Sequence, residues 1–163
     1  MIIVVMGVSG AGKTTVGRLL SDRLGWEFLD ADDFHPPVNK EKMARGEPLT
    51  DADRAPWLEA LAGAIRARLA SHASVVLACS ALKEAYRQQL RLSPEVRFVH
   101  LRADSETLRQ RLERRRGHYF RAGMLASQLA ALEEPADALS IDAASSPEAI
   151  ASQIERAFGA ARD

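Results

Sequence analysis

The first fifteen residues, MIIVVMGVSGAGKTT, constrain the fold of this chain more than any other stretch. The apolar run at residues 2–5 is too short for a helix and has the length of a fully buried strand. Residues 7–14 then match the pattern G-x-x-x-x-G-K-[ST] at every fixed position. Glycines allow backbone angles that turn successive N–H groups inward around an anion, and a helix predicted at residues 13–24 points its N-terminus at the same place. This order of strand, glycine loop and helix predicts a binding site for nucleotide phosphates.

Each fixed side chain of this phosphate loop (residues 7–14) has a defined function in nucleotide binding. In loops of this kind the lysine, here Lys13, reaches the β- and γ-phosphates, and the next hydroxyl, here Thr14, is a ligand of Mg²⁺. A chance match is the weaker explanation, because the motif has the required strand before it and helix after it. The residues predicted to bind ATP are Gly7, Val8, Ser9, Gly10, Ala11, Gly12, Lys13, Thr14 and Thr15.

The composition of the chain restricts its class and its partners. With 163 residues, 47% of them hydrophobic and 27% charged, it is expected to form one globular domain over residues 1–163. The formal net charge of zero gives no reason to expect nucleic acid or an acidic membrane as a partner. The single cysteine, Cys79, excludes an internal disulfide framework, and the apolar run before Gly7 is too short for a signal peptide or a membrane span. We therefore expect a cytoplasmic protein.

Apolar runs alternate with helical periodicity along the rest of the chain. Strands are predicted at residues 26–29, 74–79, 96–101 and 138–141. Helices of about 10–15 residues separate such strands in βαβ units, which form parallel sheets. We therefore predict a three-layer α/β/α P-loop NTPase fold with a parallel sheet of about five strands. Asp51 or Asp53 is expected to cap the helix that follows, with Pro56 in its first turn.

Three carboxylates and a histidine follow the second predicted strand. The segment DADDFHP places them at the carboxyl end of that strand, where ligands of open parallel sheets bind; they are Asp30, Asp32, Asp33 and His35. Carboxylates this close together are costly unless a cation or a hydroxyl group lies among them. A solvated acidic turn is the alternative, and the neighbouring phosphate loop makes it the weaker one.

The carboxylate near Mg²⁺ is expected in the same acidic segment. Many P-loop proteins end another buried strand on an aspartate that helps to hold the metal. Here the strand at 74–79 ends on Cys79 and Ser80 instead. Asp30 or Asp32 is therefore the nearest candidate.

Seven arginines lie between residues 102 and 121, at positions 102, 109, 111, 114, 115, 116 and 121. A charge run is usually a solvated face or a nucleic-acid patch, but this cluster is local and the rest of the chain cancels its charge. Arg111 and Arg115 are four residues apart on one predicted helical face, and Gly117 supplies a hinge beyond them. We predict a mobile arginine-rich lid at about residues 114–123, because an arginine on a transferring phosphoryl group is worth about 10³–10⁵ in rate.

Two classes of function remain open for such a nucleotide site, a phosphotransferase and a nucleotide-dependent switch or motor. A guanine-specific switch needs an N/T-K-x-D motif after a later strand, and the nearest match, at residues 39–42, lacks the aspartate. The sequence also lacks the LSGGQ-like signature of transporter ATPases. The small size, the acidic segment and the predicted lid favour a small-molecule kinase.

Five segments of the sequence resemble the gluconokinase family of small P-loop kinases. They are residues 7–15, LDADDFHP at 29–36, GEPLTDADRAPWL at 46–58, CSALKEAYR at 79–87 and GHYF at 117–120. The resemblance implies the reaction ATP + D-gluconate → ADP + 6-phospho-D-gluconate, with Mg²⁺ as cofactor, in a cytosolic and usually homodimeric enzyme. Shikimate kinase and the nucleoside monophosphate kinases are related and give the competing activities.

The same resemblance implies roles for residues around the phosphates. Lys13 and Arg115 would be catalytic and would act on the phosphoryl groups. Asp32 would act as general base or orienter on the substrate hydroxyl, a role worth about 10²–10⁴-fold in rate. Asp30 would hold Mg²⁺, and Arg111 would stack on the adenine ring of ATP.

Gluconate carries a carboxylate, and its site therefore needs a cation. Two of the three candidate cations, Lys83 and Arg87, are predicted on one helical face because they are four residues apart. A histidine and a serine are the candidates for binding hydroxyl groups. The predicted substrate-binding residues, centred on a segment at about 30–58, are Asp32, His35, Arg54, Ser80, Lys83 and Arg87.

Overall fold

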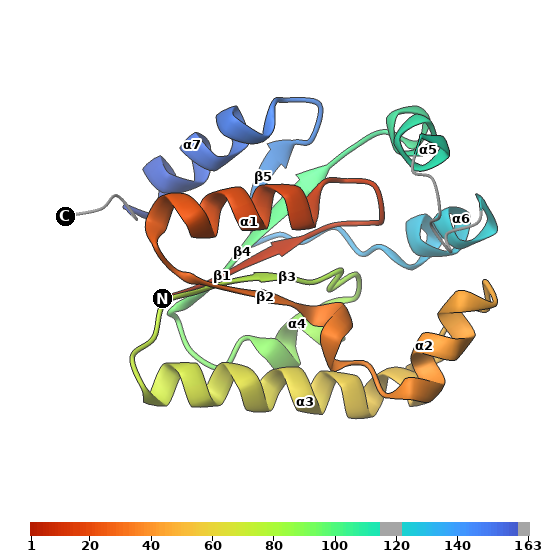
Figure 1. Ribbon diagram of the computed structural model, residues 1–163, viewed down its shortest axis with the longest axis horizontal. Helices are drawn as coiled ribbons and strands as arrows, with labels where there is room; N and C mark the ends of the chain where they lie inside the picture. Colours follow the sequence, from red (N-terminus) through yellow and green to blue (C-terminus); the bar gives the residue numbers. More distant parts are fainter. Residues whose placement is uncertain (115–121, 160–163) are drawn as a thin grey trace.

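A five-stranded parallel sheet forms the centre of the computed structural model, which describes residues 1–114 and 122–159 (Figure 1). The strands lie in the order β2-β3-β1-β4-β5, and each neighbouring pair is parallel. Their bounds are Ile2–Met6 for β1, Glu27–Asp30 for β2, Val75–Ala78 for β3, Val96–Arg102 for β4 and Leu139–Asp142 for β5.

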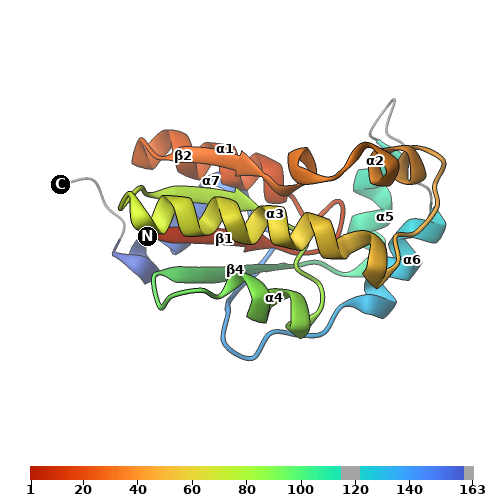
Figure 2. The ribbon, with the colours of Figure 1, turned by 90° about the horizontal axis from the view of Figure 1, so that it is seen from below.

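Helices cover both faces of this sheet, so the predicted three-layer α/β/α fold is confirmed. On one face lie α1 (Lys13–Leu24) and α7 (Pro147–Phe158); on the other lie α3 (Asp51–Ala70) and α4 (Glu84–Leu90), which Figure 2 shows from below. Further helices gather at the carboxyl ends of the strands: η1 (Ala31–Phe34), α2 (Pro37–Ala44), α5 (Ser105–Glu113) and α6 (Ala122–Ala131). Within the described part of the chain, no helix combines the length and the apolar character that a membrane crossing requires.

Alternate residues of β1 pack into two different hydrophobic clusters. Ile3 and Val5 pack with apolar residues of α1 and α7, whereas Ile2 and Val4 pack with those of α3 and α4. Side chains of a strand alternate between the faces of a sheet, so a central strand with both faces covered is apolar throughout. The phosphate loop therefore leaves the sheet from its central strand, whose five residues are all buried.

The start of α3 differs from the sequence-based expectation. Thr50 caps the helix: its Oγ1 accepts a hydrogen bond from the Asp53 N–H at 3.1 Å, and Asp53 Oδ2 accepts one from the Thr50 N–H at 2.9 Å. This reciprocal capping box begins the helix at Asp51 and places Pro56 inside it, beyond the first turn. The prediction that Asp51 or Asp53 is the N-cap of this helix is therefore wrong, because the N-cap is Thr50.

Candidate active site

A cavity of about 790 Å³ opens at the carboxyl ends of β1, β2 and β3. Its walls come from the phosphate loop, the acidic segment after β2, the start of α3, the loop after β3, and α6. The structure thus brings together residues that lie far apart in the sequence. The predicted site residues that line it are Ser9, Gly10, Gly12, Lys13, Thr14, Asp30, Asp32, His35, Arg54, Ser80 and Lys83.

Two glycines hold the phosphate loop in a backbone conformation that other residues rarely adopt. The φ angles of Gly10 and Gly12 are 86° and 98°, both in the left-handed region. Gly12 is also the N-cap of α1, and no side chain among the described residues caps this helix. Lys13 Nζ donates a hydrogen bond to the Val8 carbonyl at 3.0 Å, so its ammonium lies over the loop. A helix N-terminus beside an ammonium group is an anion site.

Asp30 ends β2 beside the phosphate loop, and its pKa is raised. Burial is the main cause; the charges of Asp32 and Asp33 also raise the pKa, and Lys13 opposes them. The Oδ1 atom of Asp30 accepts a hydrogen bond from the Asp32 N–H at 3.0 Å. A half-buried carboxyl group of this kind is stabilised as the anion when a cation binds beside it.

The residues around Thr14 and Asp30 fit a Mg²⁺ ion that is bound together with a nucleotide. Among the described residues, no three His, Cys, Asp or Glu side chains could hold a metal ion on their own. Mg²⁺ at kinase sites usually takes only one or two protein ligands and completes its shell with phosphates and waters. The Thr14 hydroxyl and the Asp30 carboxylate, which line the same cavity, could supply them.

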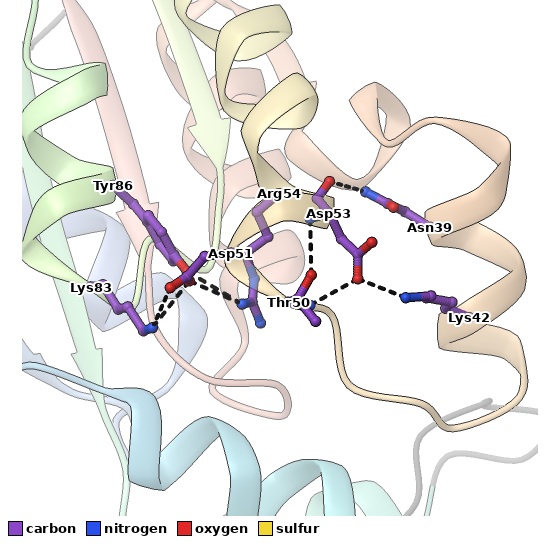
Figure 3. A network of polar contacts seen from close by, with 8 residues as sticks. All are labelled: Asn39, Lys42, Thr50, Asp51, Asp53, Arg54, Lys83 and Tyr86. Atoms are coloured by element: carbon purple, nitrogen blue, oxygen red, sulfur yellow. Dashed lines mark hydrogen bonds and ion pairs between the residues drawn. The ribbon is translucent and has the colours of Figure 1, made fainter.

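Asp51 and Tyr86 hold two cations that line the cavity, Arg54 and Lys83 (Figure 3). Lys83 Nζ lies 3.1 Å from Asp51 Oδ1, and the Tyr86 hydroxyl donates a hydrogen bond to the same oxygen. Arg54 Nη1 donates to the Tyr86 hydroxyl oxygen at 3.3 Å. One carboxylate faces two cations, so the group has a net positive charge and can bind an anionic substrate. The roles of Asp51 and Tyr86 were not foreseen from the sequence.

A second set of polar contacts joins α2 to the start of α3 (Figure 3). Asp53 Oδ2 accepts hydrogen bonds from the Thr50 N–H and from Lys42 Nζ, each at 2.9 Å. These contacts lower the pKa of Asp53 to about 2, the Thr50 N–H having the larger effect. The helix that bears Arg54 is therefore fixed to the helix that follows the acidic segment.

His35 lies in the wall of the cavity as a buried ring. It stacks on Trp57 with ring centroids 4.5 Å apart and an interplanar angle of 9°, and Trp57 Nε1 donates to the Ala31 carbonyl at 2.7 Å. Burial lowers the pKa of His35 to about 4, and the charges of Arg54 and Lys40 contribute. The ring is consequently neutral at physiological pH.

The structure removes Arg87 from the substrate candidates. Its side chain is 1% exposed and does not line the cavity. The guanidinium donates hydrogen bonds to the carbonyls of Ala81, Leu82 and Glu133 at 2.8, 3.1 and 2.9 Å, and pairs with Glu84 at 2.9 Å. Ala81 has a φ angle of 45°, which is strained for a residue with a Cβ. Arg87 therefore holds the loop that carries Ser80 and Lys83 and does not bind substrate directly.

We expect Arg87→Met to lower the free energy of unfolding by at least about 2 kcal/mol, because each buried carbonyl left without a donor costs about 1–3 kcal/mol. Arg91→Met is the matched control, since Arg91 pairs with the same Glu84 at 3.2 Å but is 29% exposed. Surface pairs of that kind are worth about 0–1 kcal/mol. Urea unfolding followed by circular dichroism measures both variants. Equal stabilities of the two would contradict the structural role of Arg87.

A second cavity, of about 360 Å³, adjoins the phosphate loop. Arg111 lines it and donates to the carbonyls of Gly10 and Ala143 at 3.2 and 2.6 Å. The apolar side chains of Val16 and Ile150 face the same space. A planar guanidinium beside apolar side chains can stack on an aromatic ring such as a nucleobase. Of the residues predicted to bind ATP, Ala11, Thr15 and Arg111 lie here in addition to Gly10 and Gly12.

Gln128 of α6 contacts the phosphate loop directly, which no sequence feature indicated. The Ser9 N–H donates to Gln128 Oε1 at 2.8 Å, and Gln128 Nε2 donates to Ser9 Oγ at 3.2 Å. The segment before α6 contains most of the predicted lid. Its residues 115–121, Arg115 among them, lie outside the described residues.

The phosphate loop, the acidic segment after β2 and the cations of Arg54 and Lys83 line one cavity at the carboxyl edge of a P-loop sheet. This fold and this site define the class of P-loop kinases that act on small molecules.

Comparison with known proteins gives the family. The family model described as an AAA domain matches residues 2–135. A gluconokinase of Gluconobacter oxydans is 46% identical over 162 residues, which are 97% of this chain and 91% of the relative. The crystal structure of a gluconokinase from Sinorhizobium meliloti has a TM-score of 0.82 at 38% identity and covers 96% of this chain and 94% of that one. That of a sugar kinase from a Janibacter species has a TM-score of 0.89 at 42% identity, with coverages of 99% and 98%. The chain belongs to the gluconokinase family.

Proposed function

We infer that this protein transfers the γ-phosphoryl group of ATP to D-gluconate and forms ADP and 6-phospho-D-gluconate. Membership of the gluconokinase family supports this reaction. The structural observation that carries it is the single cavity lined by the phosphate loop, the Asp32 carboxylate and the cations of Arg54 and Lys83. Gluconate has a hydroxyl group at one end and a carboxylate at the other, which matches this set of groups.

Asp32 is the proposed catalytic residue for the acceptor. It orients the 6-hydroxyl of gluconate and takes its proton as the new O–P bond forms. Lys13 and the N–H groups at the start of α1 stabilise the charge on the transferring phosphoryl group. Thr14 and Asp30 would hold Mg²⁺, which would supply positive charge to neutralise the phosphates.

The carboxylate end of the substrate lies against the two cations that line the cavity. Arg54 and Lys83 bind the carboxylate, and their positions are fixed by Asp51 and Tyr86. His35 and Ser80 bind hydroxyl groups along the chain of the sugar acid. These assignments place most of the substrate site in the segment at about residues 30–58.

Further assignments follow from the same proposal. Arg111 stacks on adenine, and Arg115 in a lid at about residues 114–123 contacts the phosphates. We also propose that the chain is a single cytoplasmic kinase domain that works as a homodimer and requires Mg²⁺. Light scattering after gel filtration, against a chain mass of 17.8 kDa, tests the dimer.

A coupled ADP-release assay tests the reaction itself. Mg·ATP is offered with D-gluconate, shikimate, a nucleoside monophosphate or no acceptor. We expect turnover with gluconate and only background rates with the other acceptors. Turnover with shikimate or a nucleoside monophosphate alone would overturn the substrate, and tight ATP binding without turnover on any acceptor would favour a nucleotide switch.

A further inference from the structure

Asn39 makes two hydrogen-bond contacts through a single nitrogen atom. It belongs to α2 and is 1% exposed. Its Nδ2 lies 2.8 Å from the Asp53 carbonyl oxygen and 3.2 Å from Nδ1 of His35. Because an amide NH₂ group has two hydrogens, one nitrogen can serve both neighbours.

The contact with Asp53 fixes the orientation of this amide. A backbone carbonyl oxygen can only accept, so the Asn39 atom that faces it must be the nitrogen and not the oxygen. The same nitrogen faces His35, and an amide nitrogen can only donate. Nδ1 of His35 must therefore accept, which means that it carries no proton.

An imidazole ring that is unprotonated at Nδ1 and neutral carries its proton on Nε2. Among the described residues, none forms a hydrogen bond with Nε2 of His35. In the same part of the chain, the only side-chain nitrogen or oxygen that is both buried and without a partner is Nδ1 of His100. Nε2 of His35 is therefore accessible, and His35 lines the cavity. Its N–H is a donor without a partner among residues 1–114 and 122–159.

We propose that Asn39 is a positioning residue that fixes His35 as the Nε2–H tautomer, so that His35 donates a hydrogen bond to an oxygen of the sugar acid. This inference rests on the proposed function for the nature of the acceptor, but the tautomer itself does not. Burial and the charges of Arg54 and Lys40 lower the pKa of His35, so the ring is neutral and carries the single proton that this tautomer requires.

The tautomer matters for specificity because it sets what the wall of the cavity can bind. Arg54 and Lys83 can only donate, and ionised Asp32 can only accept. His35 is then a further donor in the cavity, in addition to Arg54 and Lys83. Carboxylate and hydroxyl oxygens satisfy such groups, whereas an ammonium group would leave the donors unpaired.

The tautomer can be measured without substrate or turnover. Long-range ¹⁵N–¹H spectra of protein labelled at its four histidines distinguish a ring nitrogen with a proton from one without. The His35 signals are those missing from a His35→Gln variant. We expect a bare Nδ1, a protonated Nε2 and no titration above about pH 5, given a pKa of about 4. A proton on Nδ1, or titration near the ordinary pKa, would overturn the assignment whatever the substrate proves to be.

Kinetics with gluconate test the donor. The side-chain amide of glutamine reaches the position of Nε2, whereas that of asparagine reaches only that of Nδ1. His35→Gln should therefore keep a kcat/KM for gluconate about 5-fold higher than His35→Asn, the factor expected for one neutral hydrogen bond. Equal losses in the two variants would overturn donation to the substrate while leaving the tautomer in place.

Asn39→Asp tests the link between the two residues. A carboxylate at this position accepts from Nδ1, so His35 gains a proton there and its pKa rises. The other charges that act on the ring, Arg54 on α3 and Lys40 on α2, are unchanged. At low pH the doubly protonated ring still donates from Nε2; above the new pKa it keeps only the Nδ1 proton. The KM for gluconate should then rise with pH in this variant, unlike in the wild type.

Lys42→Met is the matched control for that variant. Lys42 also joins α2 to Asp53, at 2.9 Å, but it makes no contact with His35. The Lys42→Met variant should loosen the contact between α2 and α3, but it should change neither the tautomer of His35 nor the pH dependence of the KM for gluconate. The same pH-dependent KM in both variants would show that Asn39 acts only through the packing of α2 and would overturn the proposal.

Discussion

Asp32→Asn is expected to lower kcat for gluconate phosphorylation by about 10²–10⁴-fold, the usual contribution of a general base. Asparagine has the same shape but cannot take a proton. The side chain of Asp32 is exposed to the cavity, and the hydrogen bond to Asp30 uses only the Asp32 backbone N–H at 3.0 Å. Folding and ATP affinity should therefore change little. Steady-state kinetics with gluconate, together with a titration of ATP binding, measure the two effects separately.

Asp33→Asn is the matched control for this variant. Asp33 lies next to Asp32, lines the same cavity and also raises the pKa of Asp30. If Asp32 acted only through its charge on Asp30, both variants would lower kcat alike. We expect kcat of the Asp33 variant to stay within about 3-fold of wild type, less than 1 kcal/mol in activation free energy. An unchanged kcat in Asp32→Asn would assign Asp32 a structural role.

The fold could be predicted from the sequence because the patterns that indicate it lie within short stretches of the chain. The fully buried strands β1 and β3 are short apolar runs, and the phosphate loop joins β1 to α1 within a few residues. The start of α3 was missed because Asp51 and Asp53 are good caps by type, whereas the reciprocal bonds of Thr50 and Asp53 decide the boundary. Local residue preferences predict that the helix exists, but they do not predict its first residue.

The site was predicted less completely, because burial and long-range contacts decide it. Lys83 and Arg87 were expected on one helical face, but α4 begins at Glu84 and Lys83 is its N-cap in an extended conformation. Arg87 thus turns into the interior while Lys83 faces the cavity. Spacing alone cannot separate these two cations.

The partners of the site residues were missed for a related reason. Gln128 and Ser9 are 119 residues apart, and Tyr86 and Asp51 are 35 apart. No periodicity connects residues at such separations. Asn39 is closer to His35, four residues along the chain, but His35 precedes Pro36, the N-cap of α2, so the i, i+4 rule for residues of one helix does not apply to this pair.

Lys13→Ala is expected to abolish most turnover, with a loss of about 10³-fold or more in kcat/KM for ATP. Its ammonium lies over the phosphate loop, 3.0 Å from the Val8 carbonyl, where charge develops on the transferring group. Removing one donor of that kind costs about 10²–10³ in rate, and a cation that contacts the phosphoryl group is worth up to about 10⁵. The coupled assay and circular dichroism together show whether activity is lost while the fold remains.

Arg18→Ala is the control on the same helix, because it removes a cation of α1 that is exposed and stacks over Phe28 at 4.7 Å. Its turnover should match wild type, whereas near-normal kcat in Lys13→Ala would overturn the assignment of the phosphate loop.

The Lys13→Ala variant should also change the pH dependence of the Mg²⁺ requirement. Lys13 opposes the rise in the pKa of Asp30, so its removal raises that pKa further and favours the protonated carboxyl. Under the proposed role of Asp30 in holding Mg²⁺, the Mg²⁺ requirement of the residual activity should therefore increase as the pH is lowered, because the metal then competes with a proton.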